Sequence, residues 1–440
     1  MNVFFVSLGC DKNLVDSEHM LSLLQKHGYS ICDDERIADV IVINSCCFIK
    51  DAMEESIDTI IEMGRMKEEG NCKALIVCGC LSQRFAEEFR EELPEVDGVI
   101  GTNSYDAIVS VIDDVLAGKE AKALRPLEGM PQNDGRVVTT GGFFAYLKIA
   151  EGCDKHCSYC IIPKIRGDFR SVPMEELIEE ATQLARDGVK ELVLVAQEVT
   201  VYGTDLYGKK MLPTLLRKLS EIEGIRWIRL LYCYPEEITD ELIDEMATNP
   251  MVCHYIDMPI QHISDRILGR MGRRTSSQDI YDMIAKLRDR IPDITLRTTL
   301  ICGFPGETEA DHQEVMRFIR EAAFDRLGAF TYSPEDGTVA AGFPEQVDEV
   351  IKDLWYNDVM SAQQEIAFAK NEDLIGQTFD VMIEGRVSGE DVYVGRTFRD
   401  APNVDGYVFV NANHELMSGD FVRATITAAK DYDVIGEIVE

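Results

Sequence analysis

The fold is decided around residues 151–160, EGCDKHCSYC, which contain three closely spaced cysteines. These are Cys153, Cys157 and Cys160, in a Cys-x3-Cys-x2-Cys pattern. An iron–sulfur cubane usually takes four cysteine ligands, one for each iron, and no fourth cysteine follows nearby. The pattern therefore predicts a [4Fe–4S] cluster with one open iron, which can bind the amino and carboxylate groups of S-adenosylmethionine. A three-thiolate zinc site completed by His156 is the alternative.

The sequence around this segment alternates strands and helices. Residues 143–335 contain six apolar stretches with helical periodicity between them. The predicted strands are AYLKIAEG, KELVLVAQ, RWIRLLY, HYIDMPI, TLRTTLICGF and RLGAFTYS. Six units are too few for a closed eight-stranded barrel, so we predict an open, partial (βα)6 TIM-like barrel with a wide lateral mouth. The cysteine segment leaves the carboxyl end of the first strand, where active sites of such barrels lie.

The flanking regions predict two further domains. Residues 1–124 alternate continuous apolar strands with helices, which indicates a doubly wound parallel sheet covered on both faces. Residues 125–142 are rich in Gly, Pro and polar residues and are interpreted as a linker. The barrel domain then extends over 143–372, ending in a long acidic helix. Residues 376–440 contain short strands separated by turns, which predict a small antiparallel β-barrel.

Three more cysteines end predicted strands of the N-terminal sheet: Cys10, Cys46 and Cys80. The carboxyl ends of parallel strands meet at one edge of a sheet, where ligands bind. The three thiols should therefore meet there, either as cluster ligands or as buried structural cysteines. Cys47 and Cys78 are local competitors, because neighbours in a strand point to opposite faces.

The Cys153–Cys157–Cys160 pattern resembles the radical S-adenosylmethionine superfamily. Five residues in the cysteine loop and on other strands of the barrel are candidate cofactor contacts: Tyr159, Gln197, Glu198, Arg297 and Gly303. Tyr159 would stack on adenine, and Gln197 and Glu198 would hold the methionine amino group or cap a turn. Arg297 would pair with a carboxylate of cofactor or substrate, or form a structural ion pair. Gly303, in GFPGET, would let the backbone approach the ligand, or would form a strand-to-helix turn.

The N-terminal motifs SLGCDKNLVDSE, NSCCFIKDA and CGCLSQR resemble those of the methylthiotransferase family. The resemblance covers nearly the whole chain, and it identifies residues 376–440 as a TRAM domain. It implies a second [4Fe–4S] cluster on Cys10, Cys46 and Cys80, which presents the sulfur that is inserted. It also implies two uses of S-adenosylmethionine, one for methylation of that sulfur and one for cleavage. Cys47 stands where relatives commonly have glycine.

Long stretches, among them VAQEVTVYGTDLYG and GRTFRDAPNVDG, look like the branch that modifies an aspartate of ribosomal protein S-twelve in the small subunit. The resemblance implies methylthio insertion at the aspartate β-carbon and an external low-potential electron donor. The sister branch modifies an adenosine of transfer RNA. A third alternative is an electron-transfer iron–sulfur protein without catalysis, which would have four-cysteine ligation.

Charge separates the first two alternatives. The whole chain has a net charge of −35, and residues 376–440 hold twelve Asp and Glu against five Lys and Arg, a net charge of −7. Such a surface repels RNA and favours a basic protein partner, which makes transfer RNA an unfavourable substrate. The sequence has no apolar run long enough to span a membrane and no secretory signal pattern, so we expect a cytoplasmic protein. Disulfides are not expected among its thirteen cysteines.

Overall fold

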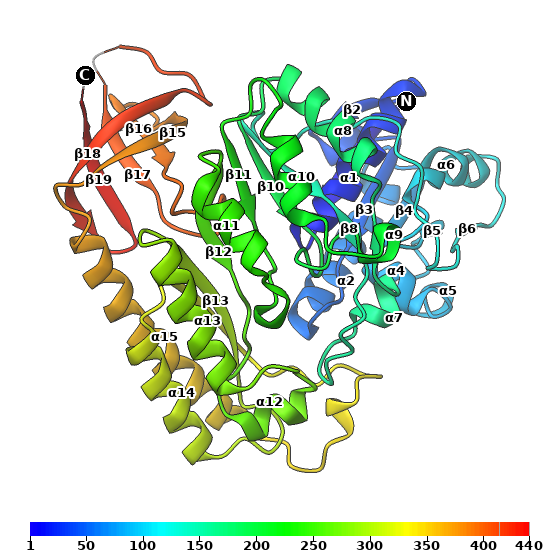
Figure 1. The fold of residues 1–440 in the computed structure, drawn as a ribbon. Helices are drawn as coiled ribbons and strands as arrows, with labels where there is room; N and C mark the ends of the chain where they lie inside the picture. Colours follow the sequence, from blue (N-terminus) through cyan, green and yellow to red (C-terminus); the bar gives the residue numbers. More distant parts are fainter. Residues whose placement is uncertain (413, 440) are drawn as a thin grey trace.

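The computed structural model describes residues 1–412 and 414–439. Its N-terminal part is a six-stranded parallel sheet in the order β2-β1-β3-β4-β5-β6 (Figure 1). The strands are β1 (Asn2–Ser7), β2 (Ser30–Cys32), β3 (Val40–Ser45), β4 (Ala74–Gly79), β5 (Gly98–Ile100) and β6 (Ala121–Ala123). The helices are α1 (Asp11–Lys26), α2 (Lys50–Gly64), α3 (Met66–Glu69), α4 (Cys80–Phe85), α5 (Phe89–Glu92) and α6 (Ile108–Leu116).

Helices cover both faces of this sheet because both faces are apolar. In β3, Val40 and Val42 pack in the cluster that includes residues of α1 and α6. Ile41 and Ile43, which point the other way, pack in the cluster that includes residues of α2 and α4. The predicted doubly wound sheet is therefore confirmed. The short edge strands β2 and β6 were not predicted, because their sequences, SIC and AKA, are mostly exposed and lack the fully buried apolar character of GVI in the equally short β5.

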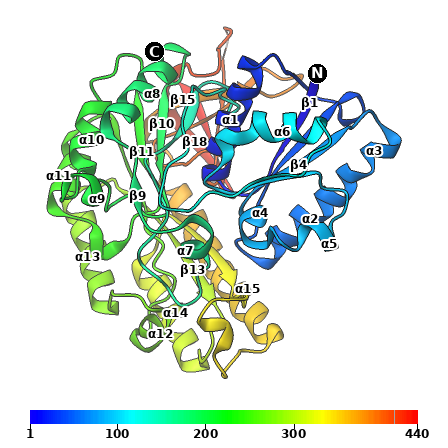
Figure 2. The same cartoon turned by 90° about the vertical axis from the view of Figure 1, so that its right-hand side faces the viewer.

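The central part is an open sheet of six parallel strands in the order β14-β13-β12-β11-β10-β7, which confirms the partial barrel. The strands are β7 (Phe144–Lys148), β10 (Glu191–Val195), β11 (Trp227–Leu230), β12 (Val252–Asp257), β13 (Thr295–Cys302) and β14 (Arg326–Thr331). Helices α8 (Met174–Arg186), α10 (Leu212–Leu219), α11 (Asp240–Thr248), α13 (Ser277–Arg290) and α14 (Glu309–Ala322) lie outside the strands (Figure 2). Shorter elements are β8 (Ala150–Glu151), β9 (Arg170–Ser171), α7 (Ile162–Arg166), α9 (Thr204–Tyr207) and α12 (Asp265–Met271).

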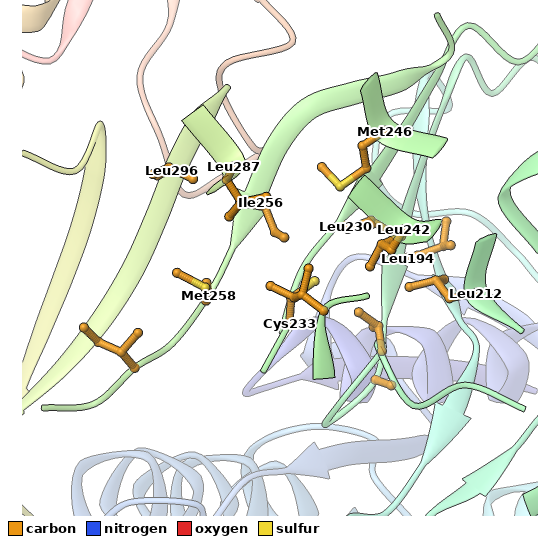
Figure 3. Close-up of a cluster of buried hydrophobic side chains, with 14 of the residues drawn as sticks. Leu194, Leu212, Leu230, Cys233, Leu242, Met246, Ile256, Met258, Leu287 and Leu296 are labelled. Atoms are coloured by element: carbon orange, nitrogen blue, oxygen red, sulfur yellow. The ribbon is translucent and has the colours of Figure 1, made fainter. Parts of the chain in front are cut away.

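The main core lies between the barrel strands and their outer helices. Figure 3 shows Leu194 and Leu230 of neighbouring strands beside Leu212, Leu242 and Met246 from α10 and α11. Cys233 lies in the same cluster, so this cysteine packs as a small apolar side chain. Burial of this layer fixes the strand ends from which the site residues project.

Helix α15 (Glu349–Glu372) leads into a closed five-stranded barrel in the order β15-β16-β17-β19-β18. The strands are β15 (Thr378–Arg386), β16 (Val392–Arg396), β17 (Val408–Asn411), β18 (Phe421–Lys430) and β19 (Asp433–Ile438). The prediction of an antiparallel barrel needs one correction, because β17 and β19 pair in parallel. A closed ring with an odd number of strands cannot alternate direction all the way round. The fifth strand, β19, was not predicted.

The inner face of the central sheet is partly covered. Tyr146 and Tyr255 pack there with Val15 of α1 and with Met382 and Ala401 of the C-terminal barrel. The lateral mouth expected of a six-stranded barrel is thus narrowed by the two flanking domains. Residues 125–142 contain no helix or strand. Within the part of the chain that the structure describes, no helix is long and apolar enough to cross a membrane.

Candidate functional site

The three cysteines of residues 151–160 come together beyond the carboxyl end of β7. Cys153 and Cys157 are buried, and Cys160 is half-buried. The pKa of Cys153 is raised to about 11, chiefly by burial and to a smaller extent by a charge on Cys157. Burial likewise raises the pKa of Cys160 to about 12, with added effects of Cys157 and Cys153. Metal binding deprotonates a thiol outright, so such sulfurs are suited to a metal rather than to free thiolate chemistry.

The loop that carries these cysteines is held in shape by its backbone. Gly152 has a φ of +78°, and a Cβ there would lie 2.1 Å from the carbonyl oxygen of Asp168. The amide of Cys153 donates to the carbonyl of Gly167 at 3.1 Å, and that of Ser158 donates to Met271 at 2.9 Å. These bonds fix the loop before any ligand is present, which lowers the entropy cost of binding one.

The donor set fits a cubane better than a single metal ion. Among the residues that the structure describes, no three His, Cys, Asp or Glu side chains are close enough to hold one metal ion. His156, the proposed fourth zinc ligand, is exposed. Each thiolate of a cubane binds a different iron, so the sulfurs need not converge on one point. Three soft thiolates with room between them therefore favour an iron–sulfur cluster over zinc.

Gln197 and Glu198 follow β10 and lie beside this site. Glu198 accepts a hydrogen bond from the amide of Thr200 at 2.9 Å, so it does cap the turn. Its Oε2 atom and the Oε1 atom of Gln197 are buried and have no hydrogen-bond partner among the described residues. Burial raises the pKa of Glu198 to about 7. Two buried acceptors on consecutive residues, neither with a hydrogen-bond partner among the described residues, suit an incoming ammonium group.

Two tyrosines border the cysteines. Tyr159 lies edge-on to Phe304, with the ring centroids 6.5 Å apart, and its stacking on adenine stays a prediction. Tyr234, which the sequence did not single out, has its hydroxyl 3.9 Å from Cys157 Sγ. The guanidinium of Arg273 lies over its ring at 4.2 Å. A tyrosine after a strand carries no local signal, so only the fold reveals this contact.

Arg297 and Gly303 have structural roles in this chain. Arg297 donates to Asp257 at 2.7 Å, which is the structural ion pair considered above. Gly303 has a φ of +76°, and a Cβ there would lie 2.2 Å from Lys352 Cγ. Its amide donates to Glu307 at 2.7 Å, as in a strand-to-helix turn. The glycine thus accommodates Lys352, and contact of either residue with a cofactor stays a prediction.

The second group of cysteines meets at the carboxyl edge of the N-terminal sheet. Cys10 is exposed and precedes α1, Cys46 follows β3, and Cys80 begins α4. Burial raises the pKa of Cys80, the Arg166 charge opposes this rise, and charges on Cys46, Cys47 and Cys10 add to it. A Cβ on Gly9, next to Cys10, would lie 2.7 Å from Cys46 Cβ. The three thiols are therefore neighbours, as three ligands of one cluster must be.

Cys46 fits this group better than Cys47 does. A charge on Cys10 acts on the pKa of Cys46, after the larger effect of burial. For Cys47, burial raises the pKa to about 12, and its principal charged neighbours are Arg84, Cys46 and Glu335. Cys78 packs on the opposite face of the sheet, beside residues of α6. The side chain of Cys46 is thus the one directed toward Cys10.

A buried ionic network, which was not predicted, connects the two groups of cysteines. Arg166, on α7, donates to Asp16 at 2.8 Å and to Glu151 at 3.0 Å. Lys148 pairs with the same two carboxylates. The second oxygen of Glu151 accepts from Gln197 at 3.1 Å. The network therefore extends from the N-terminal sheet to the neighbourhood of Cys153.

A partial βα barrel with three cysteines at the carboxyl end of its first strand defines a radical S-adenosylmethionine enzyme. Residues 147–319 match the Radical SAM superfamily, residues 2–101 match uncharacterized protein family UPF0004, and residues 375–439 match the TRAM domain. The chain is 57% identical over 437 residues to "Ribosomal protein uS12 methylthiotransferase RimO" of Lachnoclostridium phytofermentans, covering 99% of each chain. It is 50% identical over 445 residues to the protein of that name from Pelotomaculum thermopropionicum, covering 100% of this chain and 99% of the relative. The chain belongs to the RimO family of methylthiotransferases.

Solved structures share the fold at low sequence identity. The radical S-adenosylmethionine methyltransferase TsrM from Kitasatospora setae aligns with a TM-score of 0.57 at 13% identity, over 77% of this chain and 73% of that one. The cobalamin-dependent radical enzyme OxsB aligns with a TM-score of 0.53 at 14% identity, over 83% and 56%. These alignments extend beyond the barrel alone.

Proposed function

We propose that this chain inserts a methylthio group at the β-carbon of an aspartate in ribosomal protein uS12, using two [4Fe–4S] clusters and S-adenosylmethionine. The observation that carries the proposal is the presence of two separate three-cysteine sites. Each lies at the carboxyl edge of its own parallel sheet, and one buried ionic network connects them. A non-catalytic electron carrier would have no need of two incompletely ligated sites.

Cys153, Cys157 and Cys160 hold the cluster that leaves one iron open. When bound, this cluster would supply the electron for reductive cleavage of S-adenosylmethionine, which would provide the hydrogen-abstracting radical chemistry. A low-potential external donor is needed for that electron. Gln197 Oε1 and Glu198 Oε2 accept from the methionine amino group, and Tyr159 contacts adenine. The burial of Cys153 and Cys157 excludes water from the cofactor.

Cys10, Cys46 and Cys80 hold the second cluster, which carries the sulfur to be transferred. Cys46 and Cys80 are buried, whereas Cys10 is exposed. The site is therefore anchored on two sides by the sheet and accessible beside Cys10. Sulfur delivery and methylation need such access, since both reagents must come from outside.

The C-terminal barrel favours a protein substrate over transfer RNA. Its basic residues are few, and three of the five are engaged in ion pairs within the chain. Arg396 pairs with Glu191, Arg399 pairs with Asp325, and Arg386 pairs with Asp391. Phosphate recognition needs available Lys and Arg side chains, whereas a basic ribosomal protein is attracted by the acidic surface.

In the test, the reduced and reconstituted enzyme is incubated with small ribosomal subunits that contain uS12 and, in a separate reaction, with transfer RNA. Methyl-labelled S-adenosylmethionine provides the readout, with mass spectrometry of both products. We expect a methylthio mass increase on one aspartate of uS12, and formation of 5′-deoxyadenosine that depends on the substrate. A methylthio group found on RNA, and none on the protein, would overturn the choice of substrate.

A further inference from the structure

Arg166 is the one residue of the ionic network that reaches a cysteine of the second site. Its Nη2 atom lies 3.6 Å from Cys80 Sγ and also donates to Asn13. Its Nη1 atom bonds both Asp16 and Glu151. The guanidinium is thus held from one side by two carboxylates and directed toward sulfur on the other.

The position of Arg166 in the chain explains this reach. Helix α7 begins two residues after Cys160 and ends at Arg166. The carbonyl of the next residue, Gly167, accepts from the amide of Cys153. Helices α4 and α7 contact each other, and Cys80 begins α4. The segment that carries Cys153, Cys157 and Cys160 therefore also places the Arg166 guanidinium beside Cys80 of the second site.

A buried cation such as Arg166 destabilises the fold unless its charge and its N–H groups have partners. Arg166 is only 2% exposed. Removal of an ion from water is unfavourable, and paired charges and hydrogen bonds offset this loss of hydration. Asp16 and Glu151 are shared with Lys148, so the four charges of the network balance. The Nη2 atom of Arg166 donates to Cys80 and Asn13, which are its only partners among the described residues.

We propose that Arg166 is a positioning residue for the second cluster. Arg166 donates a hydrogen bond to the Cys80 sulfur, and it keeps the reduction potential of the cluster higher than a neutral side chain at this position would. This inference rests on the second cluster of the proposed function. Hydrogen bonds to cluster sulfurs and nearby positive charge both raise the potential, because they stabilise the added electron. The planar guanidinium has five N–H donors in a fixed geometry, so it can donate to two carboxylates and to a sulfur on different sides. The lysine ammonium lacks this geometry.

The experiment measures the potential of the second cluster alone. The full-length chain with Cys153→Ala, Cys157→Ala and Cys160→Ala is reconstituted anaerobically, counted for iron and titrated with a reductant while the cluster signal is followed. Adding Arg166→Gln should shift the midpoint to a more negative potential. Arg166→Lys keeps the charge without the fork and should lie between the two.

The matched control is Arg136→Gln. Arg136 is a buried arginine that pairs with Glu18 and Glu180 and has no cysteine among its main charged neighbours. Its loss should leave the midpoint unchanged, whatever it does to stability. A midpoint in Arg166→Gln equal to that of the parent, at full iron content, would overturn the role of Arg166.

Two further outcomes are also decisive. If Arg166→Gln fails to hold iron, Arg166→Lys decides: a shifted midpoint supports the role, and an unshifted one overturns it. If the parent chain itself binds no iron after reconstitution, the proposed second cluster fails, and the role of Arg166 fails with it. The iron count of the parent therefore separates the two failures.

Discussion

Glu191 and Arg396 form a fully buried ion pair at 2.7 Å between the central barrel and the C-terminal barrel. The other oxygen of Glu191 pairs with Arg229 Nε, also at 2.7 Å. Arg229 in turn donates to the carbonyl of Phe398. One carboxylate thus pairs with two guanidinium groups where β10 and β11 meet β16, and Glu384 supplies a second carboxylate to Arg396. The orientation of the TRAM domain therefore depends on the Glu191 carboxylate, which belongs to the central barrel.

Replacement of Glu191 by Ala should detach the C-terminal barrel. Both arginines would be left buried without their shared partner, and breaking a buried pair typically costs about 3–5 kcal/mol. Denaturant unfolding should show a loss of this order, with earlier release of residues 376–440 in limited proteolysis.

The control for this change is Asp391→Ala. Asp391 pairs with Arg386 on the surface, where the side chains are 86% and 54% exposed. Exposed pairs contribute roughly 0–1 kcal/mol, so the control should unfold almost as the parent does. Equal proteolytic resistance of Glu191→Ala and the parent would contradict the anchoring role.

The strands were predictable because burial leaves a local pattern. VIVI at the start of β3 and ALIVCG in β4 are continuously apolar, as strands covered on both faces must be, and both lie in strands of the structure. Strand β19 is different, because Asp433 begins it and Asp431 lies two residues before it, so the sequence at its start has the composition of a turn. Its pairing comes from barrel closure, which is a property of the whole domain.

The cysteines were predictable for a related reason, whereas their surroundings were not. The end of a strand marks the edge of a sheet, so Cys46 and Cys80 could be placed together from sequence. The ionic network joins Asp16 to residues 148–166, and such a distance along the chain leaves no periodicity to detect. Tyr234 was missed likewise, because its neighbour Cys157 belongs to another strand end.

Glu198 should make stability depend on pH. Its pKa is raised from 4.5 to about 7, so the folded protein binds this proton more tightly than the unfolded chain does. The resulting stabilisation is full below pH 4.5 and is lost as the pH rises through about 7. Glu198→Gln cannot ionise. In cluster-free protein its stability relative to the parent should rise by about 2 kcal/mol between pH 5.5 and 8.5.

Denaturant titrations of the parent and Glu198→Gln across that pH range supply the measurement. Asp279→Asn is a suitable comparison, because hydrogen bonds from Ser276 lower the pKa of that exposed carboxyl. Its stability difference from the parent should change with the opposite sign, and only at lower pH. A pH-independent difference for Glu198→Gln would show that the carboxyl is already ionised at pH 5.5.

Gly152→Ala should disrupt the cysteine loop. Alanine at a φ of +78° is strained, and its Cβ would lie 2.1 Å from a backbone oxygen that cannot move aside cheaply. We expect loss of one cluster, about four iron atoms per chain after reconstitution. Gly269→Ala is the matched control, since it lies inside α12 with no atom within 4 Å of the added Cβ. It should keep all its iron and gain up to about 1 kcal/mol in stability.

Single alanine substitutions should distinguish Cys46 from its neighbour Cys47. Cys46 is directed toward Gly9 and Cys10, whereas Cys47 contacts Arg84. Cys46→Ala should therefore remove the second cluster and lower the iron content from about eight to about four atoms per chain. Cys47→Ala should leave the iron content unchanged and cost only the packing of a buried thiol. The two variants differ by one position and remove the same atom, so general destabilisation affects both alike. Full iron in Cys46→Ala together with loss in Cys47→Ala would reverse the assignment, because the strand would then direct the other face toward Cys10 and Cys80.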